Sequence, residues 1–217
     1  MNKSQIKIAI LVGLIVATAV TYSVIQLGVM PLILLGIPAI PAYIFWYHIY
    51  LKNPVEPSLI IPLFLITAAA FFLHVIEEFY GHYSPAISRL FNFAWSDDKF
   101  ILVILLLAAA ICLVCVGLFY KKAIAGFIAI FFIVTRFGEL ALFIFPLIKP
   151  QIEPGLNETI SRTINGKLVP DMPNYYFSVT HAYYWPGMYT VARPLITAFL
   201  AVYMLAIKKT DSNKGLT

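Results

Sequence analysis

One short stretch of the sequence places several ionisable side chains inside an otherwise apolar run. His74, Glu77, Glu78 and His82 follow Phe71-Phe72-Leu73: the two glutamates lie three and four residues after His74, and His82 lies four after Glu78. Residues three and four apart share one face of an α-helix, so a helical segment would put His74 beside both glutamates. Charged groups are costly in hydrocarbon and mark functional sites by default. We therefore expect a site at His74, Glu77 and Glu78, with His82 solvated beyond it.

The His-x-x-Glu-Glu pattern is typical of a metal site. In the inverted zinc-protease pattern H-x-x-E-H, the outer residues bind the metal and the glutamate between them is the base. On this interpretation His74 and Glu78 are metal ligands and Glu77 is the general base. Zinc accepts His and carboxylate ligands and keeps one position open for water in catalytic sites, while iron suits carboxylate-rich sets with His. The sequence thus predicts a divalent metal, zinc or iron.

Two later segments carry polar residues that can join this site. Arg136 and Glu139 lie past the midpoint of a second apolar run, and His181 precedes Pro186-Gly187 in the last one. We expect Glu139 and His181 to complete the metal shell, and Arg136 to orient the substrate or hold an anion. Two plainer interpretations stay open: a structural pair of Arg136 with Glu139, and an interfacial His181.

The same residues also support chemistry without a metal. Carboxyl groups buried in apolar surroundings can donate or accept protons near neutral pH. Glu and His side chains walled by Tyr and Trp can stabilise a carbocation through charge and aromatic faces. This alternative predicts an acid–base isomerase or cyclase that acts on an isoprenoid or sterol-like lipid.

The composition shows which kind of element must position these residues. Of the 217 residues, 61% are hydrophobic and 12% are charged, and the mean hydropathy is +0.89. Soluble domains have about 45–50% apolar and about 25% charged residues, so too few charges are present here to cover a water-facing surface. Soluble enzymes, nucleic-acid-binding proteins and disordered chains are therefore excluded. The net charge of +5 comes from Lys and Arg at the ends of apolar runs, where membrane proteins place their anchors.

The apolar runs predict an all-α, polytopic membrane helix bundle that forms a single domain. A crossing needs about 20 predominantly apolar residues. The Pro186-Gly187 pair breaks the last apolar segment before its crossing. Long outer loops at 82–99 and 150–174 and a polar tail at 208–217 complete the chain. We expect six spans, at about 6–27, 30–51, 58–80, 100–120, 123–148 and 187–207.

Lys and Arg counting predicts the orientation. These residues are denser on the side that holds the amino terminus, the 52–57 loop, the 121–122 turn and the tail, so both termini should be cytoplasmic. The His and Glu residues then lie in the outer leaflet. His48 falls at the opposite end, where we expect an aromatic belt rather than the site. Cys112 and Cys115 fall inside a span, where we expect buried packing.

Three blocks of the sequence resemble the HXXEE-domain membrane proteins. They are the stretch from His74 to Glu78, the polar patch around Glu139, and the Thr180-His181 segment leading into Pro186-Gly187-Met188-Tyr189-Thr190. The family consists of small, mostly bacterial integral membrane proteins in which metal binding has been suggested. The resemblance covers about residues 60–207 and implies a site at His74, Glu77, Glu78 and His181. It also implies a bacterial plasma membrane location. The chain is more weakly similar to the sterol-isomerase-like EXPERA group.

The leading hypothesis is an integral membrane enzyme that hydrolyses a lipid or other small apolar substrate with a divalent metal. His74, Glu78, Glu139 and His181 are its predicted metal site, and Glu77 and Arg136 are its predicted catalytic residues. The metal-free isomerase or cyclase is the second hypothesis. The third is an ion-coupled transporter, because prolines interrupt the second and last spans as they do in broken transporter helices. Membrane lipid is the expected partner in each case, and nucleic acid is not.

Overall fold

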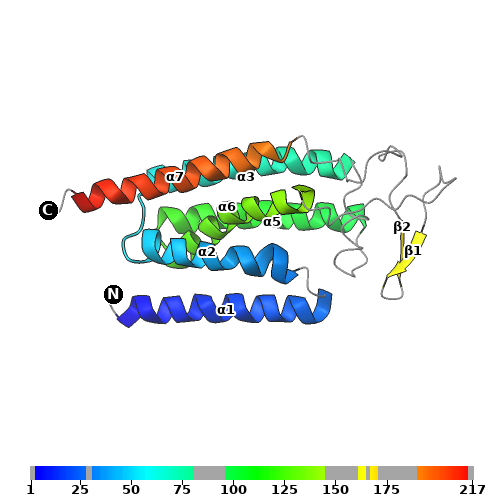
Figure 1. Ribbon diagram of the computed structural model, residues 1–217, viewed down its shortest axis with the longest axis horizontal. Helices are drawn as coiled ribbons and strands as arrows, with labels where there is room; N and C mark the ends of the chain where they lie inside the picture. Colours follow the sequence, from blue (N-terminus) through cyan, green and yellow to red (C-terminus); the bar gives the residue numbers. More distant parts are fainter. Residues whose placement is uncertain are drawn as a thin grey trace.

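The helices of the chain lie side by side in a bundle (Figure 1). In this computed structural model the described residues are 3–27, 31–80, 96–144, 161–164, 167–170 and 190–214. They confirm the predicted helical architecture. The described α-helices are α1 (Lys3–Leu27), α2 (Ile37–Trp46), α3 (Pro57–Tyr80), α5 (Asp97–Phe119), α6 (Ala123–Ile144) and α7 (Ala192–Lys214).

Four helical segments of the described chain are long and apolar enough to cross a membrane. They are Lys3–Gln26, Leu32–Leu51, Pro57–Tyr80 and Asp98–Phe119. Helix α7 has a shorter apolar part, Ala192–Ile207, and then continues as a helix through polar residues to Lys214. These apolar helices are compatible with a membrane protein, and the count of six spans stays a prediction.

The second span is one continuous helical rod despite its prolines. Two π-helical turns, η1 (Leu32–Gly36) and η2 (Tyr47–Leu51), flank α2. Proline has no backbone N–H, so Pro38 and Pro41 remove two donors from the regular helical pattern. In η1 the N–H of Ile37 bonds to the carbonyl of Leu32, five residues earlier, so the helix is widened just before Pro38. The predicted interruptions are therefore local widenings of the helix.

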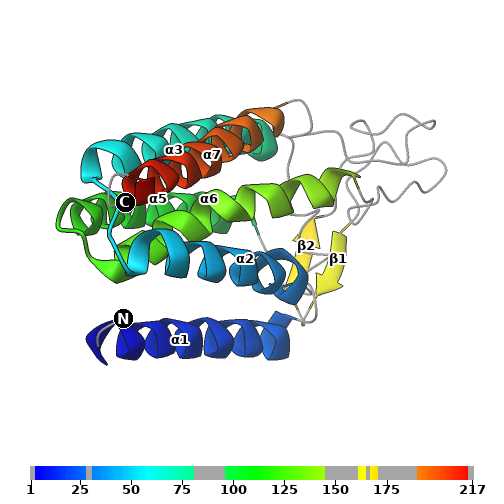
Figure 2. The same ribbon diagram turned by 60° about the vertical axis from the view of Figure 1, so that its left-hand side comes forward.

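Helix α6 lies in the middle of the bundle. It packs against α2, α5, α7 and α3, while α3 lies along α7 in both ribbon views (Figures 1 and 2). The α6 side chains Ala129, Ile130 and Ile133 are almost completely buried. Helix α1 lies at the edge and is joined to α2 by the hydrogen bond from Tyr43 Oη to the Ala9 carbonyl, 2.9 Å long. The core thus forms around α6, where α2, α3, α5 and α7 pack against it.

Two features differ from the sequence-based expectations. A two-stranded antiparallel hairpin, β1 (Ser161–Ile164) and β2 (Lys167–Pro170), lies within the predicted 150–174 loop. Its strands are too short to give a clear alternating pattern. The expectation of buried packing is wrong for Cys112, which is exposed, and Cys115 is only partly buried. Cys112 lies on the exposed face of α5.

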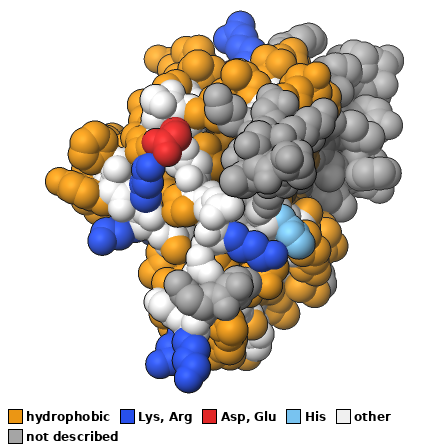
Figure 3. Space-filling view, turned by 90° about the vertical axis from the view of Figure 1, so that its left-hand side faces the viewer, with side chains coloured by type: hydrophobic (Ala, Val, Ile, Leu, Met, Phe, Trp, Pro, Cys, Tyr) orange, Lys and Arg blue, Asp and Glu red, His pale blue; other side chains and the backbone are white. Residues whose placement is uncertain are grey.

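Both ends of the described chain lie at the same end of the bundle (Figure 1). Basic side chains are spread over this face (Figure 3). Lys52 and Lys122 are exposed there, and exposed Lys121 pairs with Glu56 at 2.8 Å. We name this the basic end. It agrees with the expectation that the termini share a side, and its cytoplasmic location stays a prediction.

Candidate functional site

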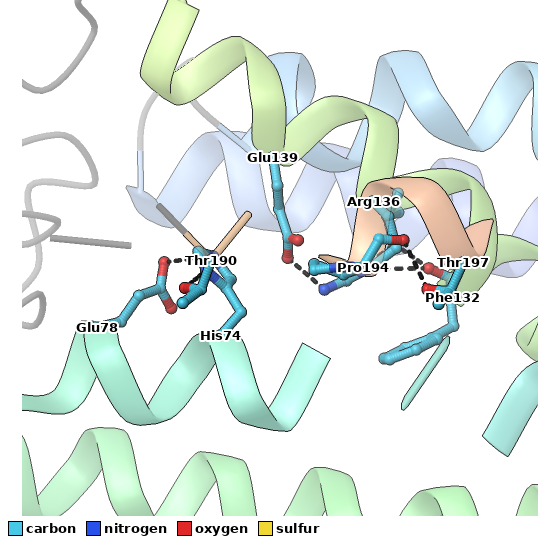
Figure 4. A network of polar contacts seen from close by, with 9 residues as sticks. His74, Glu78, Phe132, Arg136, Glu139, Thr190, Pro194 and Thr197 are labelled. Atoms are coloured by element: carbon cyan, nitrogen blue, oxygen red, sulfur yellow. Dashed lines mark hydrogen bonds and ion pairs between the residues drawn. The ribbon is translucent and has the colours of Figure 1, made fainter. Parts of the chain in front are cut away.

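His74 is the centre of a polar cluster at the end of α3 far from the basic end. The side chain is completely buried, and its Nε2 lies 3.2 Å from Oε1 of Glu78, one helical turn further on (Figure 4). The structure therefore brings together the pair that the i,i+4 spacing predicts. Packing against α7 buries this face of α3, since Val75 is also covered.

The other imidazole nitrogen of His74 contacts a residue that sequence reasoning did not select. Nδ1 lies 3.0 Å from Oγ1 of Thr190, and the same hydroxyl donates a hydrogen bond to Oε2 of Glu77. Thr190 stands at the start of α7, where its carbonyl accepts the N–H of Arg193 at 3.0 Å. The four side chains form a continuous polar chain from Glu78 through His74 and Thr190 to Glu77. We name it the α3–α7 cluster.

The position of Thr190 in the sequence indicates the start of a helix. This threonine lies shortly after Pro186-Gly187 and directly before an apolar run, a position typical of a helix N-terminus. That pattern predicts where a helix begins. It does not predict that the hydroxyl reaches α3, because 113 residues separate Thr190 from Glu77.

Arg136 and Glu139 form a buried ion pair within α6, as their spacing allows (Figure 4). Two further guanidinium nitrogens of Arg136 donate to the carbonyl of Phe132 and to the hydroxyl of Thr135, each at 3.1 Å. The guanidinium also lies over the rings of Phe71 and Phe132, at 4.1 and 4.4 Å from their centroids. A cation over aromatic faces gains electrostatic stabilisation, more so where water is excluded. Arg136 is therefore held firmly in place.

The ion pair faces the α3–α7 cluster across the bundle interior. Arg136 and Glu139 project from α6 on one side, and His74 and Glu78 project from α3 on the other (Figure 4). The second carboxylate oxygen of Glu139, Oε2, is buried and has no hydrogen-bond partner among the described residues. A buried polar atom without a partner is costly unless something else binds it. We name the α3–α7 cluster together with Arg136 and Glu139 the polar site.

The predicted metal ligands come together only in part. Across the described ranges, no group of three His, Cys, Asp or Glu side chains is arranged to hold a metal ion. His74 and Glu78 supply two donors to one point, while Glu139 is engaged by Arg136. His181, the predicted further ligand, lies outside the described residues. The described donor set is therefore incomplete for a metal centre.

His48 lies apart from the polar site, as its position in the sequence predicts. It is exposed near the basic end, on the turn η2. His48 also lines an apolar cavity of about 620 Å³ between α2, α6 and α7, together with Val134 and Phe137 of α6. These two α6 residues flank Arg136 in the sequence, so the cavity approaches the same part of α6 from another face.

The chain matches no family model, no curated protein and no solved structure. The resemblance to the HXXEE-domain proteins therefore stays a prediction, and the function must be argued from the polar site.

Proposed function

We propose that the protein is an integral membrane enzyme that hydrolyses a lipid or another apolar substrate at the polar site. One observation carries this proposal: buried His74 contacts a carboxylate through one ring nitrogen and a hydroxyl through the other. A purely structural imidazole in an apolar bundle needs only to satisfy its two nitrogens. Here two carboxylates, a hydroxyl and a second ion pair surround it.

This arrangement suits general acid–base catalysis. Proton transfer in the transition state by a positioned His or Glu contributes typically about 10²–10⁴-fold to a rate. Glu78 orients the imidazole of His74, while Glu77 lies against a hydroxyl whose proton it can take. The site therefore holds an orienting carboxylate and an accepting carboxylate on one helical turn. The buried ion pair of Arg136 and Glu139 supplies a fixed field beside them.

The surroundings support an apolar substrate. The polar site lies in a bundle whose outer faces are apolar, with Leu73 and Ile76 exposed on the outward side of α3. A lipid would reach the site from the bilayer without crossing water.

A divalent metal is a second form of the same proposal. The 3.2 Å between His74 Nε2 and Glu78 Oε1 suits two ligands of one zinc or iron ion, since each lies about 2.0–2.2 Å from the metal. The contact of Nδ1 with Thr190 is the outer support that metal-binding histidines usually have. His181 would be the third ligand. Such an ion would supply activation of water at neutral pH.

Hydrolysis by purified protein tests the proposal. Wild type, His74→Gln and the matched control His48→Gln are incubated in detergent with mixed phospholipids and with p-nitrophenyl octanoate, and products are measured by mass spectrometry and absorbance. We expect His74→Gln to lose at least about 100-fold in rate and His48→Gln to keep wild-type rate within about twofold. Equal rates in wild type and His74→Gln, or no hydrolysis by wild type, would overturn the proposal.

Metal content distinguishes hydrolysis with a divalent metal from hydrolysis by the protein side chains alone. Elemental mass spectrometry is run on protein purified without chelator, for wild type and His74→Ala. About one ion per chain in wild type that is lost in His74→Ala establishes the metal form. Full hydrolytic activity in metal-free protein contradicts that form.

A further inference from the structure

Thr190 carries the one hydroxyl in the α3–α7 cluster. It donates to the Glu77 carboxylate and lies 3.0 Å from His74 Nδ1, so two side chains of α3 fix it in place. We propose that Thr190 is the nucleophile of the polar site and that the substrate is a carboxylic ester of a lipid. This inference rests on the proposed hydrolytic function and names its covalent step.

The contacts supply what an alcohol nucleophile needs. A threonine hydroxyl is a weak nucleophile unless an adjacent base removes its proton, and that base must itself be oriented by another group. Glu77 is in direct contact with the hydroxyl proton. His74 positions the oxygen from a second side, and Glu78 holds His74 at 3.2 Å.

The start of α7 supplies a place for developing negative charge. The carbonyl of Thr190 accepts the N–H of Arg193 and that of Val191 accepts the N–H of Leu195, so the helix begins at the nucleophile itself. The Arg193 N–H is already bonded and Pro194 has no N–H, so the groups at this helix start that can face an oxyanion are the N–H groups of Val191 and Ala192, which carry partial positive charge. Such an end stabilises an oxyanion that forms on the attacked carbonyl.

A structural role for Thr190 is the competing explanation. A threonine at a helix start usually turns its oxygen back to cap its own helix. The Thr190 hydroxyl is instead bound to side chains of α3, where it also joins α3 to α7. Both roles predict loss of stability when the hydroxyl is removed. Only the nucleophile role predicts a covalent adduct on Oγ1.

The proposed reaction passes through an ester of Thr190. Oγ1 of Thr190 attacks the ester carbonyl carbon while Glu77 takes the hydroxyl proton. The ester C–O bond then breaks, and Glu77 returns that proton to the departing alcohol. Water attacks the threonine ester next and gives one proton to Glu77. The bond from Oγ1 to the acyl carbon breaks, and Glu77 returns the proton to Thr190. Ester and water thus yield a fatty acid and an alcohol, with Thr190 and Glu77 regenerated.

Labelling with an octyl fluorophosphonate tests the nucleophile directly. In that reaction a bond forms from Oγ1 to phosphorus, the P–F bond breaks, and fluoride leaves as Glu77 takes the proton. Full-length wild type in detergent is treated with the probe, and the modified peptide is located by mass spectrometry. We expect the adduct at position 190 both in wild type and in Thr190→Ser. Thr190→Val should not be labelled.

Two further variants serve as controls. Thr197→Val removes another α7 hydroxyl, one that bonds to backbone carbonyls of its own helix, and should be labelled as wild type. Glu77→Gln should be labelled at least about 100-fold more slowly. Thermal unfolding of each variant shows that it is folded, and Thr190→Ser keeps the test decisive if Thr190→Val does not fold.

The outcomes separate this inference from the hydrolytic function. Undiminished labelling in Thr190→Val overturns the nucleophile. So does ester hydrolysis that Thr190→Val retains and His74→Gln loses, which would mean that the site activates water directly and the hydrolytic function stands. Labelling of Thr190 without hydrolysis of any ester by wild type overturns the hydrolase and leaves a reactive hydroxyl.

Discussion

The ion pairs near the two ends of the bundle differ in how far they are exposed to solvent. At the basic end, the side chains of Lys121 and Glu56 are 44% and 66% exposed, whereas those of Arg136 and Glu139 at the polar site are 8% and 22% exposed. Solvated pairs contribute little because water competes for both charges. Buried pairs must recover a large desolvation cost from their own contacts.

The polar site recovers that cost through several contacts of Arg136. Arg136 lies over the rings of Phe71 and Phe132 and donates to Thr135, besides pairing with Glu139. Phe132 also stacks edge-on against Phe64 and Phe71, at 5.5 Å in each case. A desolvated ion pair inside an apolar bundle is what we expect at a functional site.

Breaking the buried pair should have the largest effect on stability. Glu139→Gln leaves the Arg136 charge without its partner, and we expect it to cost about 3–5 kcal/mol of unfolding free energy. The double variant Arg136→Met with Glu139→Gln removes both charges and should recover most of that loss. Denaturant unfolding in detergent micelles measures both. A loss below about 1 kcal/mol in Glu139→Gln would show that water reaches the pair.

Packing rather than charge should dominate stability near the basic end. A Cβ on Gly126 would lie 2.3 Å from ring atoms of Tyr50, whose side chain is fully buried, so Gly126→Ala forces the ring to move. We expect a loss of about 1–3 kcal/mol in thermal unfolding. Gly13→Ala is the matched control, since its new Cβ meets Tyr43 only at ordinary contact distances of 3.8 Å. Equal stabilities of the two variants would contradict the close packing of Tyr50 on α6.

Removing the exposed pair should have the smallest effect. Lys121→Met and Glu56→Gln, singly or together, should each change the unfolding free energy by less than about 1 kcal/mol. High salt should reduce even that change, because it screens exposed charges. A loss of several kcal/mol would remove the contrast between the two ends.

Much of the fold could be predicted because hydropathy alone identifies apolar helices. Helix α3, described over Pro57–Tyr80, covers the apolar run in which a span was expected. The contact between His74 and Glu78 was also predictable, since helix geometry fixes neighbours one turn apart. Proline was a poorer guide: the prolines of the second span predicted an interruption, yet η1, α2 and η2 follow one another without a gap.

The missing part of the site depends on tertiary contacts. Thr190 carries no charge and was quoted only as the end of the Pro186-Gly187 block, and the packing of α7 along α3 brings it to His74. The metal prediction depended on His181, which lies outside the described residues. Local spacing can place residues on one helix face, but it cannot determine which helices pack together.

A double-mutant cycle between α3 and α7 tests most directly whether these groups form one site. The unfolding free energies of His74→Ala, Thr190→Ala and the double variant are compared in detergent. The opposite-end pair His48→Ala and Thr190→Ala is the control. The account predicts a coupling of about 0.5–3 kcal/mol between His74 and Thr190, and additive effects in the control. Additivity within about 0.3–0.5 kcal/mol for His74 and Thr190 would contradict it, because residues in contact should couple.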